Sequence, residues 1–274
     1  MTTSETSATS VDTSSNWILR CEDITKSFMG VKAVNGATFD VPRGLITALI
    51  GPNGAGKTTV VNILSGAMKS DSGRVQIESH DVTNWESHKI ARLGLMRTFQ
   101  LSRELSGLTV LENLLVAPKI QAGESLFNIF FRPGLVKRQE RENVARALQI
   151  LNTYGLYELR DNRARELSGG QKKLLEISRG VMAAPKLLLL DEPMAGVNPA
   201  LIERIGGYIL DLKRDGVTIL MIEHNLNVVE KICDHVIVLA EGRTLATGRL
   251  SELRANTQVV QAYLGEIINA STHS

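Results

Sequence analysis

The eight residues GPNGAGKT, from Gly51 to Thr58, constrain the fold of this 274-residue chain more than any other stretch. They follow the continuous apolar run LITALI and lead into KTTVVNILSGAM, where apolar residues recur with helical spacing. Such an apolar run is typical of a strand that is buried on both faces. A glycine-rich loop between a strand and a helix predicts an anion site at the helix N-terminus. We therefore expect a mostly parallel sheet covered by helices.

The loop itself matches the pattern G-x-x-x-x-G-K-[ST], which cradles the phosphates of a nucleoside triphosphate. Its glycines let backbone N–H groups surround the β-phosphate, and Lys57 is expected to contact the β- and γ-phosphates. The hydroxyl of Thr58 is expected to ligate Mg²⁺. The alternative is a glycine-rich turn with a chance lysine. The candidate nucleotide-binding residues here are Gly51, Pro52, Asn53, Gly54, Ala55, Gly56, Lys57, Thr58 and Thr59.

Two adjacent carboxylates follow another apolar run, in LLLLDEP. Asp191 ends this predicted strand at the carboxyl edge, where open α/β sheets bind ligands, and is expected to reach Mg²⁺ through water. A second carboxylate beside the first is electrostatically unfavourable unless it has a role. We expect Glu192 to orient and polarise the water that attacks the γ-phosphate. A solvated or capping glutamate is the alternative.

A histidine ends the next apolar run, VTILMIEH. His224 is expected at the same edge of the sheet as Asp191 and Lys57, where it would contact the γ-phosphate. A purely structural histidine is the alternative, and we adopt it for His88 and His235, which have no such context.

The whole chain reads as one α/β domain with a helical insertion. KLLLLDEP, VTILMIEH and HVIVLAEG are predicted strands that alternate with helical patterns, whereas WILRCEDITKSF and NGATFDVP predict half-buried antiparallel strands. Residues 101–171 contain helical segments joined by an irregular connection, which Pro133 and Gly134 close. Residues 1–16 are mostly serine and threonine and are expected to be a disordered tail, so the domain spans 17–274.

Composition limits the kinds of partner. The net charge of +2 gives no electrostatic reason to expect nucleic acid. The longest apolar runs are far shorter than the ~20 residues of a membrane-spanning helix, so a membrane role is expected to act through a partner. Cys21 and Cys233 lack metal-ligand spacing and are expected to be reduced core thiols.

A second phosphate-binding candidate is LSGGQ at residues 167–171, where small residues and a hydroxyl lead into a helical pattern. Together, GPNGAGKT, RTFQ, LSGGQ, LLLLDEP and IEH, in this order, resemble the ATP-binding subunit of ABC transporters. LSGGQ is the motif that distinguishes this family, because a phosphate-binding loop (P-loop) such as GPNGAGKT also occurs in kinases, GTPases and helicases. The resemblance implies an α/β P-loop ABC ATPase fold with a mostly parallel core sheet, an antiparallel β subdomain and an inserted α-helical subdomain.

The resemblance also implies how two phosphate cradles are used. The ligands would be ATP and Mg²⁺, and the motif of residues Ser168, Gly169, Gly170 and Gln171 would complete the ATP site of a second subunit, head to tail. Gln100 of RTFQ matches the family's glutamine loop, so it would contact Mg²⁺ and the attacking water. Phe28 matches the aromatic residue that stacks on adenine, although ATP and GTP are not distinguished by the sequence.

One residue departs from the family pattern. Many members have an aspartate in the loop after LLLLDEP, and this chain has Asn198 there. Asparagine can still form hydrogen bonds across a dimer but carries no charge.

Several stretches narrow the resemblance to ATPases that power importers of branched-chain, or hydrophobic, amino acids: GLMRTFQ, EPMAGVNP, IEHNLNVV and VVQAYLGE. The implied partners are a second ABC ATPase subunit, two transmembrane permease subunits and, indirectly, a solute-binding protein. The chain would then lie on the cytoplasmic face of the cell membrane. Alternatives are an ATPase of a urea or amide importer, of a lipid or polysaccharide exporter, or a soluble ABC protein.

Overall fold

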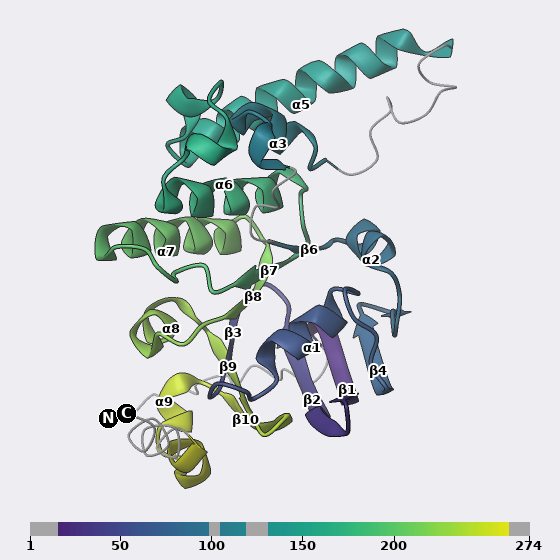
Figure 1. The fold of residues 1–274 in the computed structure, drawn as a ribbon, viewed down its shortest axis with the longest axis vertical. Coiled ribbons are helices and arrows are strands. Elements are labelled where there is room, and N and C mark those ends of the chain that lie inside the picture. The colour runs from purple at the N-terminus through teal and green to yellow at the C-terminus, as the bar shows by residue number, and fades with distance from the viewer. Residues whose placement is uncertain (1–15, 99–104, 119–130, 263–274) are drawn as a thin grey trace, which may run out of the picture.

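The computed structural model of the protein describes residues 16–98, 105–118 and 131–262. The predicted tail, apart from Asn16, therefore lies outside the described residues, and so does Gln100. The described chain forms two sheets with helices around them (Figure 1). Neither cysteine forms a disulfide; Cys21 is buried as expected, whereas Cys233 is only half-buried.

The larger sheet has six strands in the order β10-β9-β3-β8-β7-β6. Five of them run parallel, and β10 pairs antiparallel with β9 at one edge. The strands are β3 (Ile46–Ile50), β6 (Leu95–Arg97), β7 (Leu187–Asp191), β8 (Thr218–Ile222), β9 (His235–Ala240) and β10 (Arg243–Gly248). The mostly parallel core sheet expected from the apolar runs is thus confirmed.

The smaller sheet is antiparallel and has the order β2-β1-β4-β5. Its strands are β1 (Trp17–Phe28), β2 (Val31–Pro42), β4 (Ser72–Ile77) and β5 (His80–Asp81). In Figure 1 it lies beside α1 (Lys57–Leu64), the helix that follows the glycine-rich loop. This is the antiparallel subdomain that the family resemblance implied.

The central strands are apolar throughout because both faces of the larger sheet are buried. Ile46, Ala48 and Ile50 of β3 belong to one hydrophobic core, which includes apolar residues of the helices above the sheet. Leu49 faces the other core, shared with α1 and the antiparallel sheet. Successive side chains of a strand point to opposite faces, so one strand serves both cores.

A helical layer covers the first core (Figure 1). Short helix α3 (Val110–Leu115) and long helix α5 (Pro133–Thr153) pack on α6 (Gly169–Met182). The other helices are α2 (Ser87–Leu93), α7 (Pro199–Arg214), α8 (Leu226–Ile232) and α9 (Leu250–Leu253), with 3₁₀ turns η2 (Leu105–Gly107), η4 (Tyr157–Leu159) and η5 (Ala164–Glu166). We keep 101–171 as the proposed extent of the helical insertion.

Two helix boundaries differ from the sequence expectation. Pro133 and Gly134 do not close a connection but form the first turn of α5, where a proline's missing N–H is not needed. Helix α1 ends at Leu64, although the apolar pattern continued to Met68. Gly66 adopts φ +70° there, and a Cβ on it would lie 2.6 Å from the carbonyl oxygen of Trp85. This left-handed residue stops the helix and turns the chain.

Within residues 16–98, 105–118 and 131–262, none of the helices combines the length and the apolar character needed to cross a membrane.

Candidate functional site

The glycine-rich loop runs directly from β3 into α1, as the sequence predicted. Gly51 has φ +152°, and a Cβ there would lie 2.1 Å from the carbonyl oxygen of Leu239. Gly56 has φ +93°, and a Cβ there would lie 2.4 Å from the carbonyl oxygen of Ala33. The loop is therefore pressed against the backbones of β9 and β2, and only glycine fits at these two positions.

Helix α1 begins without a side-chain cap. Its N-cap is Gly56, in a left-handed conformation, which has no side chain to accept a hydrogen bond from the first helical N–H groups. These donors form a site for an anion, and the helix dipole favours negative charge there. The ammonium of Lys57 donates to the carbonyl oxygens of Gly51, at 2.6 Å, and Pro52, at 2.8 Å. Lys57 thus lies across the loop that a phosphate would occupy.

A cavity of about 550 Å³ brings three predicted site residues together. Thr58 comes from the first turn of α1, Asp191 from the last position of β7, and Glu192 from the turn that follows. The full lining is Thr58, Arg97, Thr98, Lys173, Glu176, Asp191, Glu192 and Ala195. A hydroxyl and a carboxylate oxygen therefore face one space, and oxygen ligands of this kind suit Mg²⁺.

The described residues contain no cluster of three or more His, Cys, Asp or Glu side chains that could hold a metal ion. A Mg²⁺ ion at Thr58 and Asp191 would accordingly take most of its ligands from phosphate oxygens and water, as Mg²⁺ in nucleotide sites usually does. The residues present fit that mode of binding.

Asp191 has a partner that the sequence did not reveal. The guanidinium of Arg97, on β6, contacts the Asp191 carboxylate with a distance of 2.8 Å from Nη2 to Oδ2. The Arg97 side chain is only 7% exposed, and its Nη1 donates to Oδ1 of Asn62 on α1 at 2.6 Å. Arg97 therefore ties the end of β7 to the phosphate-binding helix. In the sequence, Arg97 is notable only because it belongs to the RTFQ motif, and no sequence pattern linked it to Asp191.

Glu192 has an unusual backbone conformation. Its φ is +46°, in the left-handed region that glutamate seldom adopts, and its N–H donates to the carbonyl oxygen of Ile222 at 3.1 Å. Such a conformation costs on the order of 1–3 kcal/mol and persists only where the surroundings hold it. The chain thereby turns sharply away from β7, leaving the Glu192 side chain half-buried at the cavity.

His224 lies in the loop between β8 and α8 and is exposed. It does not line the cavity with Asp191 and Glu192. The preceding residue, Glu223, is almost fully buried, and burial raises the pKa of its carboxyl. No sequence pattern indicated a role for Glu223, although a charged residue that closes an apolar run is an available signal.

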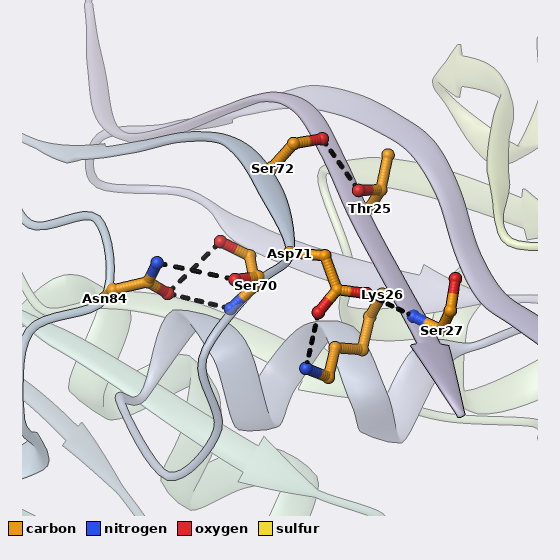
Figure 2. Close-up of polar contacts among 7 residues, drawn as sticks. All are labelled: Thr25, Lys26, Ser27, Ser70, Asp71, Ser72 and Asn84. Atoms are coloured by element: carbon orange, nitrogen blue, oxygen red, sulfur yellow. Dashed lines mark hydrogen bonds and ion pairs between the residues drawn. The ribbon is translucent and has the colours of Figure 1, made fainter. Parts of the chain in front are cut away.

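Phe28 ends β1, at the tip of the β1–β2 hairpin, and is 43% exposed. Figure 2 shows how the neighbouring residues are anchored: Asp71 accepts hydrogen bonds from Nζ of Lys26 and from the N–H of Ser27, both at 2.7 Å. The two donors hold the pKa of the Asp71 carboxyl below its ordinary value. The ammonium of Lys26 lies 5.8 Å from the Phe28 ring centroid. The ring is thus held at its base while much of it is open for stacking.

The LSGGQ motif forms the start of α6. Ser168 is the N-cap: its Oγ accepts from the N–H of Gln171 at 3.3 Å, and Oε1 of Gln171 accepts from the N–H of Ser168 at 2.8 Å. This reciprocal pair is a capping box. Residues 168–171 are not among those that line the cavity at Thr58.

The motif packs on α7, whose N-cap is Asn198. Oδ1 of Asn198 accepts from the N–H of Leu201 at 2.9 Å. A Cβ on Gly170 would lie 2.4 Å from Cδ2 of Leu201, so the two helices approach closely at this glycine. Asn198 thus has a local structural role as an N-cap, but aspartate would fill this role equally well, so capping does not explain the departure from the family pattern.

Residues 34–195, more than half of the chain, match the family model described as ABC transporter. The chain belongs to this family and is one of its nucleotide-binding ATPases. It is 44% identical to the probable branched-chain amino acid transport ATP-binding protein LivG of Archaeoglobus fulgidus, over 90% of this chain and 95% of that one. It is 38% identical to the high-affinity branched-chain amino acid transport ATP-binding protein BraF of Pseudomonas aeruginosa, over 91% and 98%.

Solved structures agree with the fold. A nucleotide-free ATP-binding cassette from an ABC transporter has 42% sequence identity and a TM-score of 0.78, over 90% of this chain and 98% of that one. The ADP conformation of such a cassette has 42% identity and a TM-score of 0.78, over 91% and 99%. The family and the fold class inferred from the motifs are therefore confirmed, including the resemblance to the ATPases of branched-chain amino-acid transporters.

Proposed function

We propose that the chain binds ATP with Mg²⁺ and hydrolyses it to power an importer of branched-chain or other hydrophobic amino acids. The observation that carries the hydrolytic part is the joint position of Thr58, Asp191 and Glu192 on one cavity beside the phosphate-binding loop. The solute class rests on the relatives, whose names specify branched-chain amino acid transport at 37–44% identity over about 90% of the chain.

Each site residue then has a defined task. The N–H groups of residues 51–59 bind the phosphates, and Lys57 exchanges its two carbonyl partners for phosphate oxygens. Thr58 and Asp191 hold Mg²⁺, which when bound neutralises charge on the β- and γ-phosphates. Glu192 orients the attacking water and accepts its proton, and His224 contacts the γ-phosphate. Phe28 stacks on the base.

Gln100 remains part of the proposal as a second contact to Mg²⁺ and the attacking water, although it lies outside the described residues.

The partners follow from the second phosphate cradle. Ser168, Gly169, Gly170 and Gln171 contact ATP held by a second ABC ATPase subunit, and that subunit's motif does the same in return. This arrangement is supported by the absence of these four residues from the lining of the chain's own cavity at Thr58. Two permease subunits bind the ATPases at the cytoplasmic face of the membrane, and a solute-binding protein delivers the amino acid.

The test uses Glu192→Gln, which keeps the side-chain shape and removes the base. Turnover of MgATP should fall by about 100-fold or more, in line with the usual contribution of a general base. Because ATP then persists, excess MgATP should shift the solution mass from monomer to dimer, or to a heterodimer when the companion ATPase is added. Glu86→Gln, at an exposed carboxylate, is the matched control and should change neither. Normal turnover by Glu192→Gln would contradict the proposed hydrolytic site.

The solute is tested with the assembled transporter in vesicles. Uptake of labelled leucine should require ATP and should stop with Glu192→Gln in this chain. ATP-driven uptake of urea or amides instead of leucine would reassign the solute while leaving the ATPase assignment intact.

A further inference from the structure

Glu223 is a buried carboxylate between two loops of the proposed site. It follows β8 directly, precedes His224, and is 1% exposed. None of the ion pairs formed within residues 16–98, 105–118 and 131–262 includes it. A carboxylate away from water and without a cation is unfavourable unless hydrogen-bond donors compensate it.

The donors that partly compensate the burial of Glu223 are backbone N–H groups, and they come from two different loops. Oε1 accepts from the N–H of Met194 at 3.1 Å. Oε2 accepts from the N–H of His224 at 3.2 Å and from that of Asn225 at 3.5 Å. One oxygen therefore serves the turn after β7, and the other serves the loop after β8.

The turn after β7 is the one that contains Glu192, two residues before Met194. Strands β7 and β8 are parallel neighbours, with Asp191 paired to Ile222. The carbonyl oxygen of Ile222 holds the N–H of Glu192 at 3.1 Å, and the Glu223 carboxylate holds the far side of the same turn. The strained left-handed conformation of Glu192 is thus fixed from both sides by the end of β8.

We propose that Glu223 is a positioning residue, whose single carboxylate fixes the distance between the loop of Glu192 and the loop of His224. The inference rests on the proposed roles of those two residues. Glu223 itself need not touch ATP. It holds the loops of Glu192 and His224, whose side chains must both reach the same γ-phosphate. Small displacements of such groups lower the rate of hydrolysis strongly.

Glu223→Gln tests this with little change in volume. The amide keeps one acceptor oxygen and places an NH₂ group opposite a backbone N–H, so one of the two loops loses its partner. The phosphate-binding loop between β3 and α1 is untouched. We expect kcat for MgATP to fall about 10- to 100-fold, while KM and the dissociation constant for ATP stay within about twofold, because the phosphate contacts that set affinity are unchanged.

The control is Asp234→Asn, at a carboxylate that also forms an ion pair with Lys213 at 2.6 Å. Asp234 also accepts a backbone N–H, from Ile46 at 2.9 Å, but at the amino end of the same sheet. This variant should lower the melting temperature without lowering kcat. If Glu223→Gln does not fold, Glu223→Asp replaces it. Aspartate keeps the charge, but its side chain is one methylene shorter, so its oxygens lie farther from the N–H groups. We expect the same fall in kcat with an unchanged KM.

A double variant makes the test specific. Once His224→Ala has removed one of the two groups, adding Glu223→Gln should reduce kcat by clearly less than it does in the native chain. The proposal would be overturned if the fold-losses in kcat of the two single variants multiplied fully in the double variant. It would also be overturned if Glu223→Gln left kcat unchanged, or if it changed kcat and KM by the same factor. These outcomes test the positioning role of Glu223 alone, whereas Glu192→Gln tests the proposed ATPase function.

Discussion

Helices α1 and α6 both begin with glycine and small polar residues, but their N-termini are completed in different ways. Gly56 caps α1 in a left-handed conformation and supplies no side chain to the first turn. Ser168 caps α6 in an extended conformation and forms a capping box with Gln171. The first helix leaves its N-terminal donors to a ligand, whereas the second satisfies part of its own.

The difference teaches which cradle depends on its ligand. In the subunit alone, Lys57 occupies the loop before α1 through two carbonyl contacts, which a phosphate must replace. The start of α6 needs no such exchange. The Ser168 hydroxyl accepts from Gln171 and still has its own O–H to donate to a phosphate oxygen. A motif whose hydrogen bonds are already formed in the subunit alone would suit the proposed role of completing an ATP site in another subunit.

The largest expected effect separates the two cradles. Gly56→Ala should weaken ATP binding by the isolated chain about 100-fold, because strain and the displaced backbone together cost about 3 kcal/mol. Gly54→Ala is the control: Gly54 also has a positive φ, +77°, but a Cβ there meets nothing within 4 Å. Its loss should be at most about tenfold. Titration with ATP measures both, and equal losses would show that crowding at Gly56 is not the determinant.

An intermediate effect is expected at the second cradle. Gly170→Ala should lower turnover of the assembled complex about tenfold, since the Cβ must displace Leu201 and shift the start of α6. ATP binding by the isolated chain should not change. Adding Leu201→Ala should restore much of the turnover, whereas Gly207→Ala, where a Cβ meets nothing within 4 Å, should leave it unaltered. Reduced ATP affinity of the isolated chain would break the comparison.

The smallest effect concerns the capping box alone. Ser168→Ala should destabilise the isolated chain by about 1 kcal/mol, a fall in melting temperature of roughly 2–4 °C. Ser168→Asn keeps an N-cap acceptor and should recover most of this loss. Calorimetry of the three proteins provides the check, and an unchanged melting temperature in Ser168→Ala would mean that the box adds nothing to α6.

The candidate site could be predicted from the sequence because Gly51, Asp191 and His224 lie at the ends of apolar runs, whereas LSGGQ leads into a helical pattern. Asp191 ends β7 and Ser168 begins α6, and both boundaries follow from local patterns. The strands and helices missed were β5, β6, β10, α2 and α9, which contain too few apolar residues to show an apolar run or a period. Pro133 begins α5, although the sequence favours the end of a connection there, because a proline can mark either a break in a helical pattern or the first turn of a helix.

The contacts that support the site could not be predicted in this way. Arg97 and Asp191 are 94 residues apart, and Glu223 and Met194 are 29 apart. Only the pairing of β6, β7 and β8 in one sheet brings them together. A single sequence shows which residues carry charge, but not which distant backbone amide or carboxylate will satisfy them.

The neighbours of Gly56 and Gly170 also have a consequence for how this chain can diverge. Gly56 is confined by a carbonyl oxygen of the main chain, which every substitution at Ala33 retains. Gly170 is confined by the side chain of Leu201, which a single codon change can shorten. As far as packing decides, no second mutation can compensate for a substitution of Gly56. Positions 170 and 201 can drift together, so their substitutions should be correlated among relatives.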